Sequence, residues 1–282
     1  MMFFTQLKGE LTKLFARRRT YVGYGVFVLF ELILLITFQV DSLKSSFAEF
    51  MEQNGLAAND YFSSLTVTFL VMSFSLFFLG SIYFALISGD IVAKEVEDGN
   101  MRMVLARPIS RFRVLLLKYI SVCIYTITFV IFAGVTGYLM AAIALGLDGG
   151  LLAASAPMKL FAVYPDWSSG MLRLAIAAIL IGISMCTISS FGFLFSCMKM
   201  KPATATIMAL SVLFLDFVLA KFPIFKPIEE HFITFRMSTW LYAFENHFPW
   251  AKLADNFVFL IGLDLSLFAI ACVIFQLRDF KT

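Results

Sequence analysis

The chain has 282 residues, of which 61% are hydrophobic and 15% charged, and its formal net charge is +3. Soluble domains are usually about 45–50% apolar and about 25% charged, so this composition excludes an ordinary soluble protein and indicates several passes through a membrane. The basic residues are spread over short loops rather than gathered into one patch, so nucleic-acid binding is not expected.

The first segment, residues 1–19, has the pattern of an amphipathic helix. Its apolar residues recur at helical spacing: Phe3, Phe4, Leu7, Leu11, Leu14 and Phe15. Lys8, Lys13 and the run 17–19 supply a basic face, which predicts a helix lying in the inner membrane interface. The alternative is a simple orientation signal for the first span. The apolar run that follows is too long for a signal-peptide core, so an uncleaved first span is expected.

Six apolar runs are long enough to cross a hydrocarbon core of about 30 Å, which needs about 20 helical residues. We predict spans at about 20–40, 64–88, 119–147, 172–197, 203–221 and 257–277. Gly134, Gly137 and Gly146 leave open whether the third span is one long helix or a broken one. The expected fold class is therefore an all-α membrane protein with six transmembrane helices.

The distribution of lysine and arginine predicts the orientation. The N-terminal segment, the loop at 89–118, the turn near residue 200 and the tail carry 15 of the 22 basic residues, and the opposite side carries 7. Because basic loops remain inside, both termini and the 89–118 loop are expected to be cytoplasmic, in the cell (inner or plasma) membrane.

The 89–118 loop separates two uncharged runs of 29 residues each and itself holds ten charged side chains. Asp90 is suited to begin a short helix as its N-cap, and Asp98-Gly99 to end it. A second short helix is predicted from Asn100 to Ala106, stopped by Pro108. Ser110 is then placed to cap the third span. These signals predict a compact helical elbow between spans two and three.

The outer loops differ in character. Residues 41–63 are acidic, and residues 148–171 are rich in Gly and Ala. Residues 222–256 are dense in aromatic side chains, which indicates either a re-entrant element that folds back into the membrane or a belt lying along the interface.

Three predicted spans each hold one acid: Glu31, Asp216 and Asp264. An ionisable residue in a span is costly and usually faces protein or water. Asp216 and Asp264 are expected at equal depth, where they are able to contact one another or a common partner such as Arg173. The acids either line a polar path for substrate, cation or proton, or make structural hydrogen bonds.

The charged loop resembles the loop between spans two and three in permease subunits of type 2 ATP-binding-cassette (ABC) exporters. The match runs through Glu95, Glu97-Asp98-Gly99, Leu105 and Pro108-Ile109-Ser110-Arg111, while Asn100 and Leu117 replace a common Thr and Gly. The resemblance implies a coupling helix that docks on the ATPase. It assigns this role to Glu95, Glu97, Asp98, Gly99, Arg107, Pro108, Ser110 and Arg111.

The chain has no G-x-x-x-x-G-K-[ST] phosphate loop. The resemblance implies a separate ATPase subunit that binds ATP and Mg, a second permease copy and surrounding membrane lipid. No catalytic residue, metal or cofactor is expected on this chain. An amphipathic small molecule or a peptide is the preferred class of substrate.

Other functions remain open at this point. The charged loop is also explained as a solvated turn whose arginines only set topology. A secondary transporter driven by ion gradients is the main alternative, and a sensor or scaffold is another. An intramembrane enzyme has weak support, because Glu229-Glu230 resembles a paired-glutamate protease motif only loosely and lies in an external loop.

Overall fold

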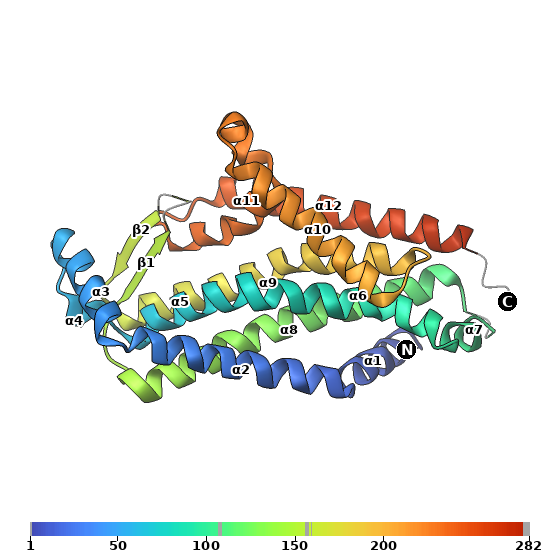
Figure 1. Cartoon of the computed structure of the whole chain (residues 1–282), viewed down its shortest axis with the longest axis horizontal. Coiled ribbons are helices and arrows are strands. Elements are labelled where there is room, and N and C mark those ends of the chain that lie inside the picture. The colour runs from blue at the N-terminus through green and yellow to red at the C-terminus, as the bar shows by residue number, and fades with distance from the viewer. Residues whose placement is uncertain (1, 107–108, 156–157, 159, 279–282) are drawn as a thin grey trace.

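The computed structural model describes residues 2–106, 109–155, 158 and 160–278, with only the main chain of Met2, Asn59, Arg102 and Leu105. Six long helices run along one axis of the molecule (Figure 1). Small helices and a pair of strands cover one end, and α1, α7 and the last turn of α12 lie near the other. We call the latter the inner end, because the distribution of lysine and arginine predicts that it is cytoplasmic. This architecture confirms the predicted all-α membrane fold.

The six helices that are long and apolar enough to cross a membrane are α2 (Arg18–Phe38), α5–η1–α6 (Ser64–Glu97), α8 (Arg111–Leu145), α9 (Trp167–Cys197), α10 (Pro202–Lys221) and α12 (Trp250–Leu277). The second and third contain 34 and 35 residues, so each is about 50 Å long. They exceed the hydrocarbon core by about 20 Å. The spans predicted at about 64–88 and 119–147 fall short of these helices at their inner ends, because the helices extend into charged sequence, to Glu97 and from Arg111.

The second span contains a π-helical turn, η1 (Leu76–Gly80), between α5 (Ser64–Ser75) and α6 (Ser81–Glu97). The third span is not broken at its glycines: α8 is continuous and ends at Gly146, whose φ of +87° favours glycine.

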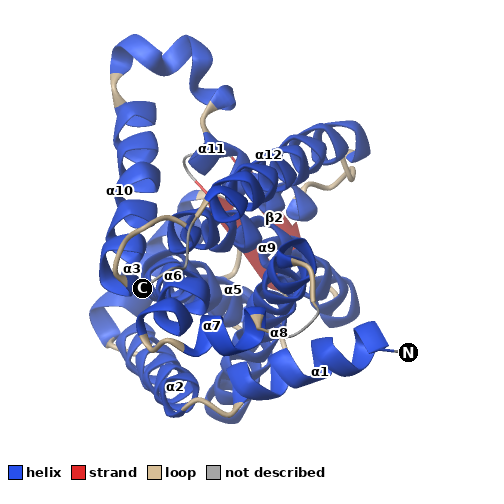
Figure 2. Cartoon of the chain, turned by 90° about the vertical axis from the view of Figure 1, so that its right-hand side faces the viewer, coloured by secondary structure: helices blue, strands red, loops and turns tan. Residues whose placement is uncertain are grey.

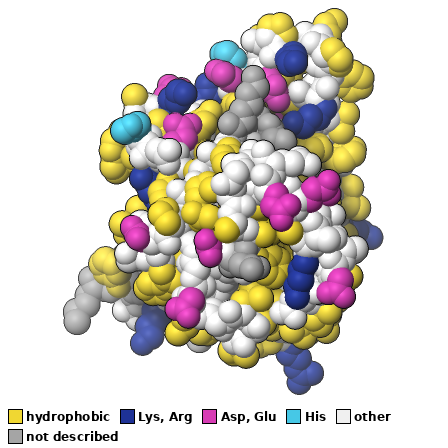
Figure 3. All heavy atoms as spheres, turned by 90° about the vertical axis from the view of Figure 1, so that its left-hand side faces the viewer, with side chains coloured by type: hydrophobic (Ala, Val, Ile, Leu, Met, Phe, Trp, Pro, Cys, Tyr) yellow, Lys and Arg dark blue, Asp and Glu magenta, His cyan; other side chains and the backbone are white. Residues whose placement is uncertain are grey.

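The remaining elements are short. They are α1 (Met2–Phe15), α3 (Asp41–Gln53), α4 (Ala58–Tyr61), α7 (Asn100–Leu105), β1 (Leu151–Ser155), β2 (Leu160–Tyr164), η2 (Pro223–His231), α11 (Ile233–Met237) and η3 (Ser238–Phe244). β1 and β2 pair antiparallel, with Leu151 opposite Tyr164. The sequence did not predict this hairpin in the Gly- and Ala-rich outer loop. Figure 3 looks onto this end and shows acidic side chains dispersed over it, as expected of a surface facing water.

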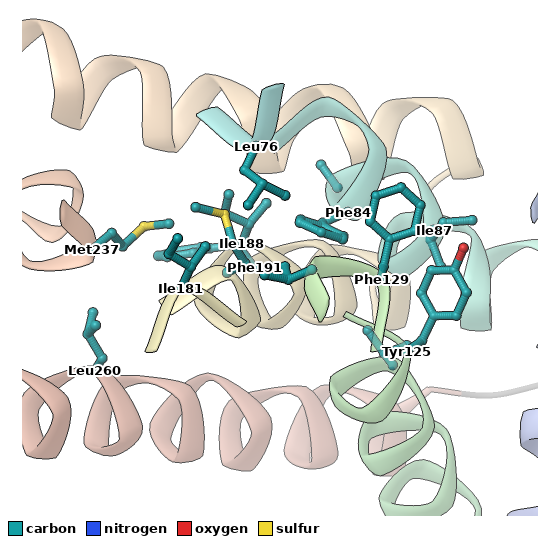
Figure 4. Close-up of a cluster of buried hydrophobic side chains, with 14 of the residues drawn as sticks. Leu76, Phe84, Ile87, Tyr125, Phe129, Ile181, Ile188, Phe191, Met237 and Leu260 are labelled. Atoms are coloured by element: carbon teal, nitrogen blue, oxygen red, sulfur yellow. The ribbon is translucent and has the colours of Figure 1, made fainter. Parts of the chain in front are cut away.

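α9 is the central helix of the bundle. Every residue of its inner half, from Ser184 to Cys197, is buried. Figure 4 shows Ile181, Ile188 and Phe191 of this helix among side chains from neighbouring helices, including Leu76, Phe84, Phe129 and Leu260. A helix buried on all sides cannot show an amphipathic period, which is why its sequence alone did not reveal a preferred face.

The aromatic segment 222–256 folds back into the bundle. The α10–η2 turn stops well short of the end that carries β1 and β2 (Figure 1). Trp240 and Phe244 of η3 are buried and contact the ring of Phe69 in α5, with centroids 6.1 and 5.1 Å away. η3 thus packs inside the bundle, whereas η2 has no buried residue. Both alternatives for this segment, a re-entrant element and an aromatic belt along the interface, stay predictions.

α6 and α9 approach closely at small residues. A Cβ added to Gly192 would lie 3.0 Å from Ser88 Cβ and 3.2 Å from the Ala85 carbonyl oxygen. Small residues at such crossings let membrane helices pack backbone to backbone. The α6–α9 contact therefore requires a glycine at position 192.

We expect Gly192→Ala to destabilise the protein by about 1–3 kcal/mol, because the added methyl overpacks this crossing. Thermal unfolding of the purified protein in detergent measures the effect. Gly262→Ala in α12 is the matched control, since a Cβ there meets nothing within 4 Å. Equal unfolding temperatures for the two variants would contradict the assigned role of Gly192.

Candidate functional site

The elbow between α6 and α8 stands at the tip of the inner end (Figure 1). α6 ends at Glu97 with Asp98 as its C-cap, and Gly99 adopts a φ of +76°. α7 follows, and the Ser110 side chain accepts a hydrogen bond from the Arg113 amide at the start of α8. The predicted helix end, second helix and serine cap are confirmed.

The predicted N-cap role of Asp90 is wrong. α6 continues through Asp90 without interruption, and the residue is 6% exposed. Its carboxylate instead accepts a hydrogen bond from Arg19 at the start of α2, with Nη1 2.6 Å from Oδ2. The preference of Asp for N-cap positions did not decide its place here, because Asp90 forms a tertiary ion pair with Arg19. The two residues are 71 positions apart, so the sequence holds no local sign of this pair.

A buried lysine joins three helices behind the elbow. Lys118 of α8 is 1% exposed, and its ammonium lies 2.7 Å from Glu95 Oε2 of α6 and 3.0 Å from Glu10 Oε2 of α1. Lys13 contacts the other oxygen of Glu10 at 2.7 Å, and Arg17 lies 3.8 Å from Glu95 Oε1. We call this alternating series of Lys13, Glu10, Lys118, Glu95 and Arg17 the inner clasp.

The surroundings of Glu10 in the inner clasp favour its charged form. Burial by itself raises the pKa of Glu10, but the charge of Lys118 and the hydrogen bonds from Lys13 and Lys118 outweigh it, so the pKa lies below its ordinary value of 4.5. A buried cation flanked by two carboxylates is expensive to break, because removing one member leaves an uncompensated charge. The clasp is thus a rigid joint between α1, α6 and α8.

Arginines join the inner end of α8 to the inner ends of two further helices, α12 and α9. Arg111 donates hydrogen bonds to the carbonyls of Gln276 and Arg278 at the end of α12, at 3.1 and 2.9 Å. Arg278 in turn donates to the carbonyls of Cys197 and Met198 at the end of α9, at 3.2 and 2.9 Å. Both satisfy orphan carbonyls at helix C-termini and link α8, α12 and α9.

The residues predicted to couple to an ATPase fall into two sets. Glu97 and Asp98 are exposed at the tip, and Gly99 and Ser110 shape the elbow. Glu95 and Arg111 point into the protein and hold its helices together. Arg107 and Pro108 lie outside the described residues.

The intramembrane acids do not form the predicted shared site. Asp216 accepts hydrogen bonds from the Ile233 and Thr234 amides at the start of α11, at 3.2 and 2.7 Å. Arg173 donates to the Ala243 carbonyl at 2.8 Å, and its guanidinium lies over aromatic rings of the outer loops. The proposed contact between Asp216 and Asp264, and the choice of Arg173 as their partner, are therefore wrong.

The other two acids lie deep in the bundle on different helices. Glu31 of α2 is fully buried, and Oε2 accepts a hydrogen bond from the Thr136 hydroxyl at 2.8 Å. Asp264 of α12 is 7% exposed and lies beside the Thr187 and Ser190 hydroxyls of α9. The sequence predicted how far along its helix each acid lies, but not which neighbouring helix its side chain faces.

Sequence reasoning missed the members of the inner clasp other than Glu95. Lys118 was counted only among the basic residues of the 89–118 loop, and Glu10, within the predicted amphipathic helix, was not singled out. The available signal was Lys118, the last charge before an uncharged run of 29 residues, since a charge at such a position usually pairs when it is buried.

Residues 8–280 match the family described as ABC-2 family transporter protein. No curated protein matches the chain.

We expect Lys118→Met to destabilise the protein by about 3–5 kcal/mol, because Glu10 and Glu95 would then face each other without their shared cation. Thermal unfolding in detergent provides the measurement. Lys13→Met is the control and should cost about 1 kcal/mol or less, because that side chain is 56% exposed. Adding Glu10→Gln and Glu95→Gln to Lys118→Met should recover much of the loss; no recovery would argue against the buried ion pairs as its cause.

Acid should weaken the contact of Glu10. Its pKa is lower in the folded protein than in the unfolded chain, so the stabilisation is present at neutral pH and is lost as pH falls below 4.5. The difference in unfolding temperature between wild type and Glu10→Gln should therefore shrink as the pH is lowered through this range. A difference that stays constant would mean that Glu10 is not charged in the fold.

Proposed function

The chain belongs to the ABC-2 transporter family, and from this premise we propose that it is the membrane-spanning permease subunit of an ABC exporter. ATP, with Mg, would be bound and hydrolysed by a separate ATPase subunit that docks on the α6–α7–α8 elbow. The proposed setting is the cell membrane, with both termini and the elbow in the cytoplasm.

The observation that carries this proposal is an elbow braced by buried ion pairs at the ends of two long helices. α6 and α8 belong to helical spans of about 50 Å, so their inner ends would reach beyond a hydrocarbon core of about 30 Å. A loop that only set topology would not need buried ion pairs behind it. Such a projecting, braced element suits the transmission of force from a motor protein.

The inner clasp defines what would move with the elbow. Lys118 connects α8 to Glu95 of α6 and Glu10 of α1, and Arg19 connects α2 to Asp90. A displacement of α7 would therefore carry α1 and the start of α2 with it. α1 lies across the bundle axis (Figure 2), as a helix in the inner interface would.

The proposed assembly contains two permeases and two ATPases. α2 and α10 lie at the periphery of the bundle (Figure 2) and leave most of their apolar surface exposed, including Leu29 and Phe214. Lipid or a second permease copy would cover these faces. An amphipathic small molecule or a peptide is the proposed class of cargo, since the outer end has only small elements.

A secondary transporter driven by an ion gradient is the second candidate, favoured by the buried carboxyls of Glu31 and Asp264. An intramembrane metalloenzyme has no comparable support. Among the described residues no group of three or more His, Cys, Asp or Glu is placed to hold a metal ion.

We expect the double charge reversal Glu97→Arg with Asp98→Arg to weaken ATPase binding and transport-coupled ATP hydrolysis at least several-fold, because both acids are exposed at the tip of the elbow. Copurification with the ATPase that accompanies the wild-type chain, and ATP hydrolysis in nanodiscs, measure the two effects. Reversing Glu49 and Glu52, which are exposed on α3 at the opposite end, provides a matched control. Unchanged assembly and hydrolysis in the elbow variant would reduce the loop to a topology signal and favour the ion-driven alternative.

A further inference from the structure

A cluster of buried oxygen atoms surrounds Asp264 where α8, α9 and α12 meet. The hydroxyls of Thr187 and Ser190 lie beside the Asp264 carboxyl, and these two residues are 0% and 1% exposed. The Tyr119 hydroxyl of α8 lies 2.8 Å from Ser190 Oγ and 3.5 Å from the main-chain carbonyl oxygen of Asp264. The cluster lies deep within three membrane-spanning helices.

Several of these oxygens lack partners. The Thr187 hydroxyl lies next to the Asp264 carboxyl, but Asp264 Oδ1 and Thr187 Oγ1 are buried without a hydrogen bond of good geometry, and so is Ser184 Oγ one turn away on α9. Helical hydroxyls usually bond to the carbonyl of the preceding turn, as Ser190 does to Cys186 at 2.9 Å. Buried polar atoms are normally satisfied, so this group is an incomplete site rather than a finished hydrogen-bond network.

No described lysine or arginine lies within ion-pair distance of Asp264. The titratable groups that face this region are Tyr119 and Cys123 of α8 and Cys186 of α9, and none of these supplies a positive charge. Arg236 of α11 is engaged elsewhere, 3.3 Å from Asp255 and over the ring of Phe259. Since the described residues supply no compensating charge, this carboxyl group must be neutralised by a bound cation or by a proton.

The available atoms indicate what that charge is. They are carboxylate, hydroxyl and carbonyl oxygens, which suit a hard cation, and the single carboxylate matches one positive charge rather than two. We propose that Asp264, Thr187, Ser190 and Tyr119 form an intramembrane binding site for one small monovalent cation, an alkali ion or a proton.

The position of the site links it to the elbow without depending on an ATPase. Tyr119 follows Lys118 directly in α8, so the two side chains point about 100° apart around that helix and reach different neighbours. Lys118 contacts α1 and α6, whereas Tyr119 contacts α9 and the main chain of α12. A bound cation would hold α9 and α12 against α8 at the turn where the inner clasp holds α1 and α6.

The test uses the permease alone, so its failure is distinct from failure of the proposed ATPase coupling. The unfolding temperature is measured in nanodiscs with choline chloride replaced by LiCl, NaCl or KCl at constant ionic strength, and from about pH 8 to about pH 5. Wild type is compared with Asp264→Asn, which keeps the shape and removes the charge, and with Thr187→Val. Thr126→Val is the control, because the Thr126 hydroxyl is equally buried but pairs with Ser189, 2.8 Å away.

An alkali-ion site predicts that one of the salts raises the unfolding temperature by a few degrees and saturably, since ligand that binds only the folded state stabilises it. A proton site predicts no dependence on salt identity but a rise as pH falls. In either case Asp264→Asn should abolish the effect and Thr187→Val should reduce it, while Thr126→Val retains it.

Two results would overturn the proposal. One is an Asp264→Asn variant that keeps the full wild-type dependence on salt and pH. The other is an equal loss in Thr126→Val and Thr187→Val, which would show a general effect of buried hydroxyls. If Asp264→Asn fails to fold, the comparison of the two valine variants decides the outcome.

Discussion

The arrangement of the inner end depends on the ammonium of Lys118. It is almost completely buried and lies within 3.0 Å of carboxylates from two other helices. A charge in such surroundings is tolerated only when its partners are held in place, because separating them would expose each to an apolar interior. The positions of α1 and α6 relative to α8 follow from this one requirement. The ion pair between Lys118 and Glu95 also fixes the two helices that carry the elbow relative to each other.

The bundle above this joint is organised around α9. Helices pack against it through small residues, as at Gly192, and its inner half presents hydroxyls as well as apolar groups. Membrane helices gain little from burying apolar side chains against each other, since lipid is equally apolar; close packing and hydrogen bonds must supply the specificity. Pairs such as Thr126 with Ser189 have this role within the membrane.

The three intramembrane acids show three solutions to one electrostatic problem. Asp216 is stabilised by main-chain amides at the start of α11, and thereby holds α11 against α10. Glu31 accepts one hydrogen bond from a hydroxyl of α8, and its other carboxylate oxygen has no partner. Asp264 also has an unpartnered oxygen, but it differs from Glu31 in lying beside several hydroxyls of two neighbouring helices.

Composition and hydropathy determined the membrane class and the number of spans. Local capping signals such as Asp98-Gly99 and Ser110 determined the sequence of elements in the elbow, because helix ends depend on nearby residues. The predicted spans were shorter than α6 and α8 at their inner ends, since hydropathy marks only the apolar part of a helix and not its continuation into charged sequence. The tertiary structure alone decided which charges meet: Asp90 became a partner of Arg19, Lys118 joined Glu10 and Glu95, and Asp216 and Asp264 were separated. Helical spacing gives the height of a side chain but not which neighbour it faces, and ion pairing depends on that direction.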